Sequence, residues 1–193
     1  MTLRQILLKK LYPFIAKNSR KTGNGIVLEK PVQSQALQPI DQVPLQLNTG
    51  EEIQLSKYKG KKVLLVNTAS DCGYTGQYEE LQKLQIEMPE KLVVIGFPAN
   101  DFKAQEKAGD KDIAAFCQKN YGVTFPLAKK SVVVKKGAQN PVFKWLSDPK
   151  SNGWNDQEPV WNFTKYLINE QGELIGVFGP AVSPLEDVIR KKI

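Results

Sequence analysis

The clearest hydrophobic pattern in the chain is the apolar run V-L-L-V at residues 63–66, which predicts a buried β-strand. Residues 67–73 are small and polar and include Cys72, and apolar positions then recur near helical spacing over residues 74–88. A second apolar run at residues 92–97 completes a strand–helix–strand unit, whose two strands should be parallel with a right-handed crossover. The pattern therefore places a cysteine just before the start of a helix.

Weaker patterns surround this unit and predict the rest of the fold. They indicate a β-hairpin at 44–55, a helix at 110–121 between Gly109 and Gly122, extended structure at 132–134, a short helix at 141–146, a second hairpin at 166–178, and a C-terminal helix opened by the capping box at 183–186. This order predicts an α/β protein with a thioredoxin-like fold, in which helices flank a central mixed sheet. The hairpin at 44–55 and an amphipathic N-terminal helix would be additions to that fold.

Residues 1–40 differ from the rest in pattern. Residues 1–20 alternate apolar and basic positions at helical spacing, and Lys9-Lys10 leaves no apolar run long enough to cross a bilayer or to form a signal-peptide core. This helix could lie on a membrane surface or dock on the domain itself, and the pattern leaves both open. Residues 18–40 are predicted to be a linker or irregular arm. We therefore expect an arm at 1–40, a single domain at 41–193, and a cytoplasmic location.

Composition restricts the chemistry. The chain has 27 Lys and Arg against 20 Asp and Glu, and we interpret this surplus of +7 as spread along the chain for solubility, with no nucleic-acid partner. There is no histidine, which excludes catalytic pairs and metal sites that need one. The two cysteines, Cys72 and Cys117, form no C-x-x-C motif and cannot build a structural zinc site. We expect no metal and no cofactor.

Cys72 has two interpretations from its position alone. At a helix start, unpaired backbone N–H groups and the helix dipole would stabilise its thiolate. It could equally be a small, inert core residue. Because the chain has no imidazole, a nucleophilic Cys72 would need backbone or amide donors.

Four motifs, VNTASDCGYTGQY, GFPANDF with Gln105 shortly after it, FCQKNYGVTFP and WNFTKYLI, resemble the glutathione peroxidase family in sequence and order. The resemblance extends from about Val43 to the C-terminus. It implies that Cys72 is the peroxidatic residue and that Gln105, Trp161 and Asn162 complete a catalytic tetrad. Taken singly, Gln105 would be interpreted as a loop residue, Trp161 as a core aromatic and Asn162 as a turn former. Together they could point hydrogen-bond donors at a sulfur anion, and these donors do not titrate near neutral pH. The implied substrates are hydrogen peroxide and organic or lipid hydroperoxides.

The position of Cys117 resembles that of the resolving cysteine in thioredoxin-using members of the family. The short connection between 146 and 161 also lacks the insertion of tetrameric, glutathione-using relatives, so a monomer or weak dimer is expected. The alternatives are a glutathione-dependent cycle with Cys117 as a bystander, or a thiol redox sensor. Two positions depart from the family pattern, since Ala99 replaces a frequent cysteine and Gly76 a frequent proline. We expect the two thiols to be apart in the reduced protein, with Cys117 buried.

Overall fold

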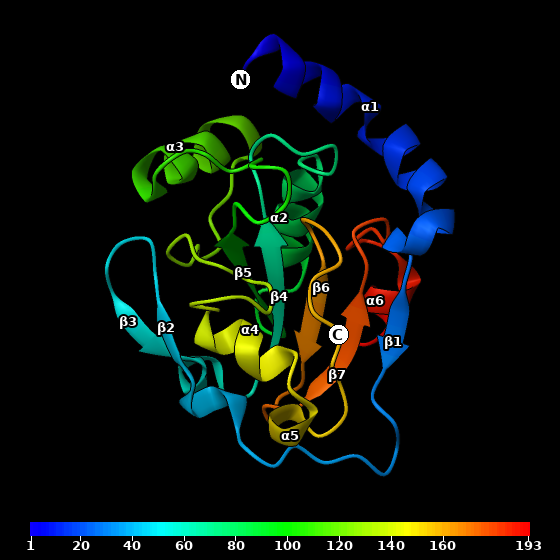
Figure 1. Cartoon of the computed structure of the whole chain (residues 1–193), viewed down its shortest axis with the longest axis vertical. Coiled ribbons are helices and arrows are strands. Elements are labelled where there is room, and N and C mark those ends of the chain that lie inside the picture. Colours follow the sequence, from blue (N-terminus) through cyan, green and yellow to red (C-terminus); the bar gives the residue numbers. More distant parts are fainter.

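A five-stranded mixed sheet forms the centre of the computed structural model, which describes all residues 1–193 (Figure 1). The strand order is β1-β7-β6-β4-β5; only β4 and β5 pair in parallel, and every other pairing is antiparallel. The strands are β1 Val27–Glu29, β4 Lys62–Thr68, β5 Leu92–Pro98, β6 Lys165–Ile168 and β7 Leu174–Phe178. The predicted strand–helix–strand unit and the hairpin of β6 and β7 are thus confirmed.

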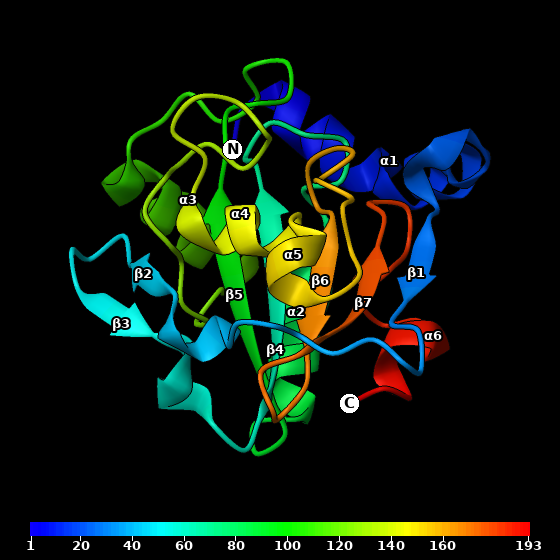
Figure 2. The same ribbon diagram turned by 60° about the horizontal axis from the view of Figure 1, so that its bottom comes forward.

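Helices lie on both sides of this sheet (Figures 1 and 2). They are α1 Leu3–Ser19, α2 Gln77–Glu87, α3 Asp110–Tyr121, α4 Pro141–Leu146, α5 Pro149–Asn152 and α6 Asp187–Arg190. Strands β2 Pro44–Gln46 and β3 Glu52–Gln54 form the predicted N-terminal hairpin as a separate two-stranded sheet. This arrangement is the predicted thioredoxin-like fold.

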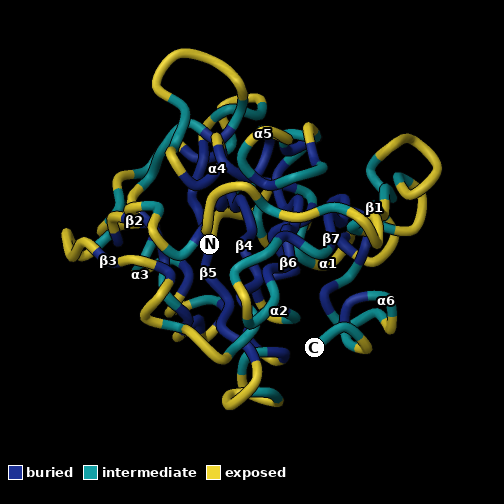
Figure 3. Tube along the Cα trace, turned by 90° about the horizontal axis from the view of Figure 1, so that it is seen from below, coloured by how far each residue is buried: buried dark blue, intermediate teal, exposed yellow.

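The alternation of side chains along β4 divides the interior into two apolar cores, because successive residues of a strand point to opposite faces. Leu64 and Val66 belong to the core that α2, α3 and α6 cover. Val63 and Leu65 belong to the core under α4 and the hairpin. Figure 3 shows β4, β5 and β6 as buried along their length. The end of β4, where the loop that carries Cys72 begins, is therefore held from both sides.

Three local predictions need correction. Residues 18–40 contain β1, which pairs with the edge strand β7, so the segment is not wholly irregular. The C-terminal helix begins at Asp187, although Ser183 and Glu186 do make capping contacts with backbone N–H groups. The extended structure expected at 132–134 is limited to one isolated bridge at Val132.

The predicted N-terminal helix forms and docks on the rest of the molecule. The Tyr12 side chain of α1 is part of the core that α2, α3 and α6 cover, and its hydroxyl donates to Glu80 at 2.8 Å. Residues 1–20 were expected either to lie on a membrane surface or to dock on the domain, and the structure has the docked helix. No helix of the chain has both the length and the apolar content needed to span a bilayer.

Candidate active site

The loop between β4 and α2 holds Cys72 in a tight turn. The Cys72 backbone N–H donates to Thr75 Oγ1 at 3.0 Å, and the Thr75 N–H donates back to the Cys72 carbonyl at 3.1 Å. The Tyr74 N–H donates to the Cys72 sulfur at 3.5 Å, and the residue is fully buried. Since α2 begins at Gln77, the cysteine lies five residues before the helix instead of at its first turn. A backbone N–H of the turn therefore provides the contact that was expected from the helix start.

Two side chains from the segment before β6 lie near the same sulfur, because the start of β6 is beside the end of β4 in the sheet. Trp161 and Asn162 belong to the segment before β6, and their side chains lie close enough to the Cys72 thiol to lower its pKa. The amide of Asn162 also donates to Gln105 Oε1 at 2.9 Å. The structure therefore brings together all four residues of the tetrad, with Gln105 joined to the cluster through Asn162.

Asn67 at the end of β4 fixes this second segment. Its side-chain amide donates to the Trp161 carbonyl at 3.1 Å and accepts from the Thr164 N–H at 3.0 Å. The Phe163 N–H donates to the Asn67 carbonyl at 2.6 Å. One buried asparagine thus positions the loop that carries both donors against the strand that precedes Cys72.

Backbone strain is concentrated beside the same residues. Lys103, Ala104 and Phe163 are the only residues other than glycine with positive φ, at 50°, 49° and 68°. They lie directly before Gln105 and directly after Asn162. Such conformations cost roughly 1–3 kcal/mol each and persist where the surrounding structure fixes them. Their clustering indicates that the orientation of Gln105 and Asn162 is held against a local preference.

The electrostatic environment of Cys72 corrects one expectation. Burial raises the pKa of the thiol, and the hydrogen bonds from Tyr74, Trp161 and Asn162 offset this only in part, while the Asp71 carboxylate raises the pKa further. Arg4 of α1 pairs with Asp71 and so moderates that unfavourable charge. In this closed arrangement Cys72 is a thiol. Its position near a helix led us to expect a thiolate, but the effect of burial on the pKa is larger.

Cys117 lies on the buried face of α3 and is a free thiol, as Cys72 is. Burial raises the pKa of Cys117 to about 12, although the neighbouring Tyr78 hydroxyl opposes this effect. The two cysteines belong to different elements and are not bonded. The expectation of a buried, unbonded Cys117 is confirmed. That a reaction between the thiols requires local movement stays a prediction.

Glu106 is a buried acid of the site that was not singled out in the sequence. Its carboxylate accepts from both the backbone N–H and the hydroxyl of Ser70 at 2.8 Å, two residues before Cys72. Burial raises the pKa of Glu106 to about 7. Its position next to Gln105 could have identified Glu106 as a residue of the site, but an acid in a polar loop is usually solvated.

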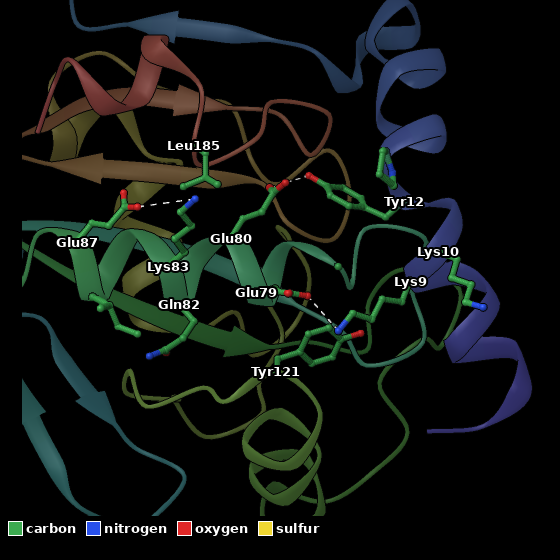
Figure 4. A pocket seen from close by; sticks show the side chains of 13 residues that line it. Lys9, Lys10, Tyr12, Glu79, Glu80, Gln82, Lys83, Glu87, Tyr121 and Leu185 are labelled. Carbon is green, nitrogen blue, oxygen red and sulfur yellow. Dashed lines mark hydrogen bonds and ion pairs between the residues drawn. The ribbon is translucent and has the colours of Figure 1, made fainter.

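Helix α1 covers the loop that carries Cys72. No sequence pattern indicated this contact. Gln5 donates to the Ser70 carbonyl at 3.2 Å, and Ile15 and Tyr12 pack over Gly73 and Gly76. An open groove of about 730 Å³ runs between α1 and α2, and Cys72 does not line it (Figure 4). The sulfur is therefore enclosed in this structure.

Comparisons with known proteins agree on one family. The model of the family described as glutathione peroxidase matches residues 41–147. A glutathione peroxidase homolog of Staphylococcus epidermidis is 43% identical over 141 residues, which cover 72% of this chain and 88% of the relative. A glutathione peroxidase-like peroxiredoxin of Saccharomyces cerevisiae is 41% identical over 136 residues, which cover 70% and 83%.

Solved structures give the same result for the fold. The structure of Trgpx in its apo form has a TM-score of 0.60 and 34% identity, and the match covers 80% of this chain and 93% of the other. A DsbF homologue from Corynebacterium diphtheriae reaches the same TM-score at 20% identity, with 88% and 94% covered, which shows the fold alone.

Proposed function

The chain belongs to the glutathione peroxidase family, and we propose that this thiol peroxidase reduces hydrogen peroxide and organic or lipid hydroperoxides through Cys72. The observation that carries the proposal is the convergence of Trp161 and Asn162 on the Cys72 sulfur, with Gln105 bonded to Asn162. These groups donate hydrogen bonds without titrating near neutral pH. They would stabilise the sulfur as it becomes anionic and orient the peroxide for attack.

In the first step the Cys72 sulfur attacks one oxygen of the hydroperoxide. An S–O bond forms as the O–O bond breaks, so Cys72 is oxidised to a sulfenic acid and the peroxide is reduced. The thiol proton ends on the departing oxygen, which leaves as an alcohol or water. Asn162 Oδ1 is buried without a hydrogen-bond partner, and the peroxide O–H is a group that could donate to it.

In the second step Cys117 would resolve the sulfenic acid. Its sulfur attacks the Cys72 sulfur, the S–O bond breaks, and the oxygen leaves as water with the thiol proton of Cys117. The product is a disulfide, which an external dithiol then reduces by exchange. We propose thioredoxin as that dithiol, and glutathione with Cys117 as a bystander is the alternative.

We further propose that residues 41–193 form the peroxidase domain, that residues 1–40 are an arm docked on it, and that the protein is a monomer or weak dimer. A cysteine pair that cycles between thiol and disulfide fits a reducing compartment, which supports a cytoplasmic location.

The test compares Cys72→Ser with Cys117→Ser in two coupled assays, one with thioredoxin and its reductase and one with glutathione and its reductase. We expect Cys72→Ser to lose turnover in both assays with an unchanged fold, because a serine hydroxyl without a base is a poor nucleophile. Cys117→Ser should still consume one equivalent of peroxide but lose turnover with thioredoxin. Turnover by Cys72→Ser at the wild-type rate would refute the assignment, and normal thioredoxin turnover by Cys117→Ser would favour the bystander role.

A further inference from the structure

Helix α1 is amphipathic, and it docks through its more polar side. Polar contacts from Arg4, Gln5, Lys9, Tyr12 and Ser19 reach the rest of the molecule, and Ile15 packs beside them. Figure 4 shows Lys9 and Tyr12 extending to Glu79 and Glu80 of α2. The Lys9 ammonium also lies 4.6 Å from the centroid of the Tyr121 ring. The mainly apolar side of the helix therefore faces away from the protein.

This docking is built into the catalytic loop. A Cβ at Gly76 would lie 2.8 Å from a ring carbon of Tyr12, and one at Gly73 would lie 3.2 Å from Ile15. Gly76 has φ of −56°, which any residue can adopt, so glycine is needed there for the approach of α1 and not for backbone geometry. The orientation of α1 is thus specified by the fold, and so is the face that it leaves outward.

The outward face is the main apolar exposure of the molecule. Six of the ten large hydrophobic residues that are exposed lie within residues 1–14. Leu3 is 87% exposed, Phe14 67% and Leu7 57%, and Leu11 lies beside them on the helix. These positions recur every three to four residues, which places them on one stripe. A contiguous apolar stripe of this kind marks an interaction surface.

The basic surplus is concentrated in the same segment, which corrects its interpretation as spread along the chain. Residues 1–28 contain six Lys and Arg and no acid, whereas residues 29–193 contain 21 basic residues against 20 acidic ones. Arg4, Lys9 and Arg20 pair with acids of the domain. Lys10 and Lys17 make no ion pair and are exposed, and Lys10 extends away from α2 (Figure 4).

We propose that the outward face of α1, made by Leu3, Leu7, Leu11 and Phe14 with Lys10 and Lys17, binds the surface of an anionic phospholipid bilayer. An apolar stripe flanked by lysines matches the boundary between acyl chains and negative headgroups. A second copy of the chain fits this face less well, because a symmetric contact would bring the lysines of the two copies together. Since α1 lies directly on the loop of Cys72, such binding would hold the candidate active site at the membrane. The proposal concerns binding and does not depend on the peroxidase function.

The experiment is cosedimentation of the full-length protein with unilamellar vesicles, either of phosphatidylcholine alone or with about 30% phosphatidylglycerol. Wild type should bind the anionic vesicles and lose most of that binding when NaCl is raised to about 0.5 M. Leu7→Gln/Phe14→Gln should weaken binding at least about tenfold, because two apolar side chains no longer enter the interface. Lys10→Gln/Lys17→Gln should weaken it by a similar factor at low salt.

The matched control is Val32→Gln/Leu37→Gln, which removes two exposed apolar side chains outside α1 and should bind as wild type does. All variants should reduce hydrogen peroxide in solution at the wild-type rate, which shows that they fold. Absence of wild-type binding to anionic vesicles would overturn the proposal. Equal binding by Leu7→Gln/Phe14→Gln would also overturn it, because the lysines alone would then adsorb to the vesicles. If sedimentation velocity shows a dimer that this variant abolishes, without vesicle binding, the face is a contact between copies.

Discussion

The Trp161 indole near the Cys72 sulfur and the Gln105 amide bonded to Asn162 can be removed singly without changing the charge of the site. Trp161→Phe keeps an aromatic ring beside Phe102 but lacks the indole N–H, and Gln105→Met keeps the approximate length of the side chain. We expect each to slow the oxidation of Cys72 by ~10²-fold or more, the scale of losing one preorganised donor. Stopped-flow oxidation with hydrogen peroxide measures this rate.

Trp154→Phe is the matched control for the loss of an indole donor. Trp154 donates to the Leu174 carbonyl at 2.8 Å, away from the sulfur, so its replacement should leave the oxidation rate unchanged. If Trp161→Phe and Gln105→Met react as fast as this control, the two residues are part of the scaffold and not of the catalytic machinery.

Glu106 should make stability depend on pH. Burial raises its pKa from 4.5 to about 7, with a further increase from Asp71 and an opposing effect of Lys130 and the Ser70 bonds. The folded state therefore binds more protons than the unfolded state between these pH values, and stability falls as pH rises through that window. Glu106→Gln should remove up to about 3 kcal/mol of this decrease, since each pKa unit corresponds to about 1.4 kcal/mol.

Urea denaturation of wild type and Glu106→Gln between about pH 4.5 and 7.5 measures the difference. The free energy of unfolding of wild type should fall relative to that of the variant as pH rises. Parallel curves would mean that Glu106 has the same pKa in the folded and unfolded states, so that its raised pKa is not a property of the folded protein.

Among the residues of the site, the grouping of Cys72, Gln105, Trp161 and Asn162 could be predicted because they lie in three motifs with characteristic residues and order. Glu106 and the raised pKa of Cys72 could not. Both depend on how completely side chains are removed from water, and a polar loop such as that around Gln105 gives no sign of this in its sequence.

At the level of elements, the contact between α1 and the catalytic loop can be tested at Gly76. Gly76→Ala places a Cβ within 3.1 Å of the Cβ and Cγ atoms of Tyr12, so α1 must shift. Overpacking of this kind costs about 1–3 kcal/mol. We expect trypsin to cleave at Lys9, Lys10 or Lys17 about tenfold faster in the variant, and we expect Cys72 to be alkylated faster.

Gly109→Ala is the matched control for this substitution. Gly109 also precedes a helix with negative φ, and a Cβ there would meet nothing within 4 Å. Gly109→Ala should leave the rates of trypsin cleavage in α1 and of Cys72 alkylation unchanged. Equal rates in Gly76→Ala and Gly109→Ala would mean that α1 does not rest on the loop in solution.

The elements themselves were predictable to different degrees. The β4–α2–β5 unit follows from runs of apolar residues that are local in sequence. Strand β1 has three residues, two of them exposed, and exists because β7 offers a free edge. The period of α1 identified a helix with two faces, but it could not show that the more polar face would dock, because that choice depends on Glu79, Glu80 and Gly76 of another element.

At the scale of the whole molecule, we expect the proposed cycle to need a change of structure. Cys72 and Cys117 are buried in different elements, and a disulfide tolerates Cα atoms no more than about 7 Å apart. Helix α3 lies between Gly109 and Gly122, the latter in the left-handed region with φ of 64°, so it has defined ends at which to unwind. Its opening would also release Cys117 from the burial that raises its pKa.

Opening of α3 should appear in hydrogen exchange when the reduced and oxidised proteins are compared. We expect faster amide exchange across Asp110–Tyr121 after oxidation with one equivalent of peroxide, while β4 and β5 stay protected. Cys117→Ser supplies the control, because it can be oxidised at Cys72 but cannot form the bond that would hold α3 open. Identical exchange in α3 before and after oxidation of wild type would contradict the movement.

The account depends most directly on the product of one turnover. Reduced wild type is treated with one equivalent of hydrogen peroxide, and its peptides are identified by mass spectrometry without reduction. We expect one peptide pair joined by a Cys72–Cys117 disulfide within a single chain, and a Cys72 sulfenic acid as the product of Cys117→Ser. Wild type in which Cys72 stays a thiol, or stops as a sulfenic acid beside a free Cys117, would contradict the account.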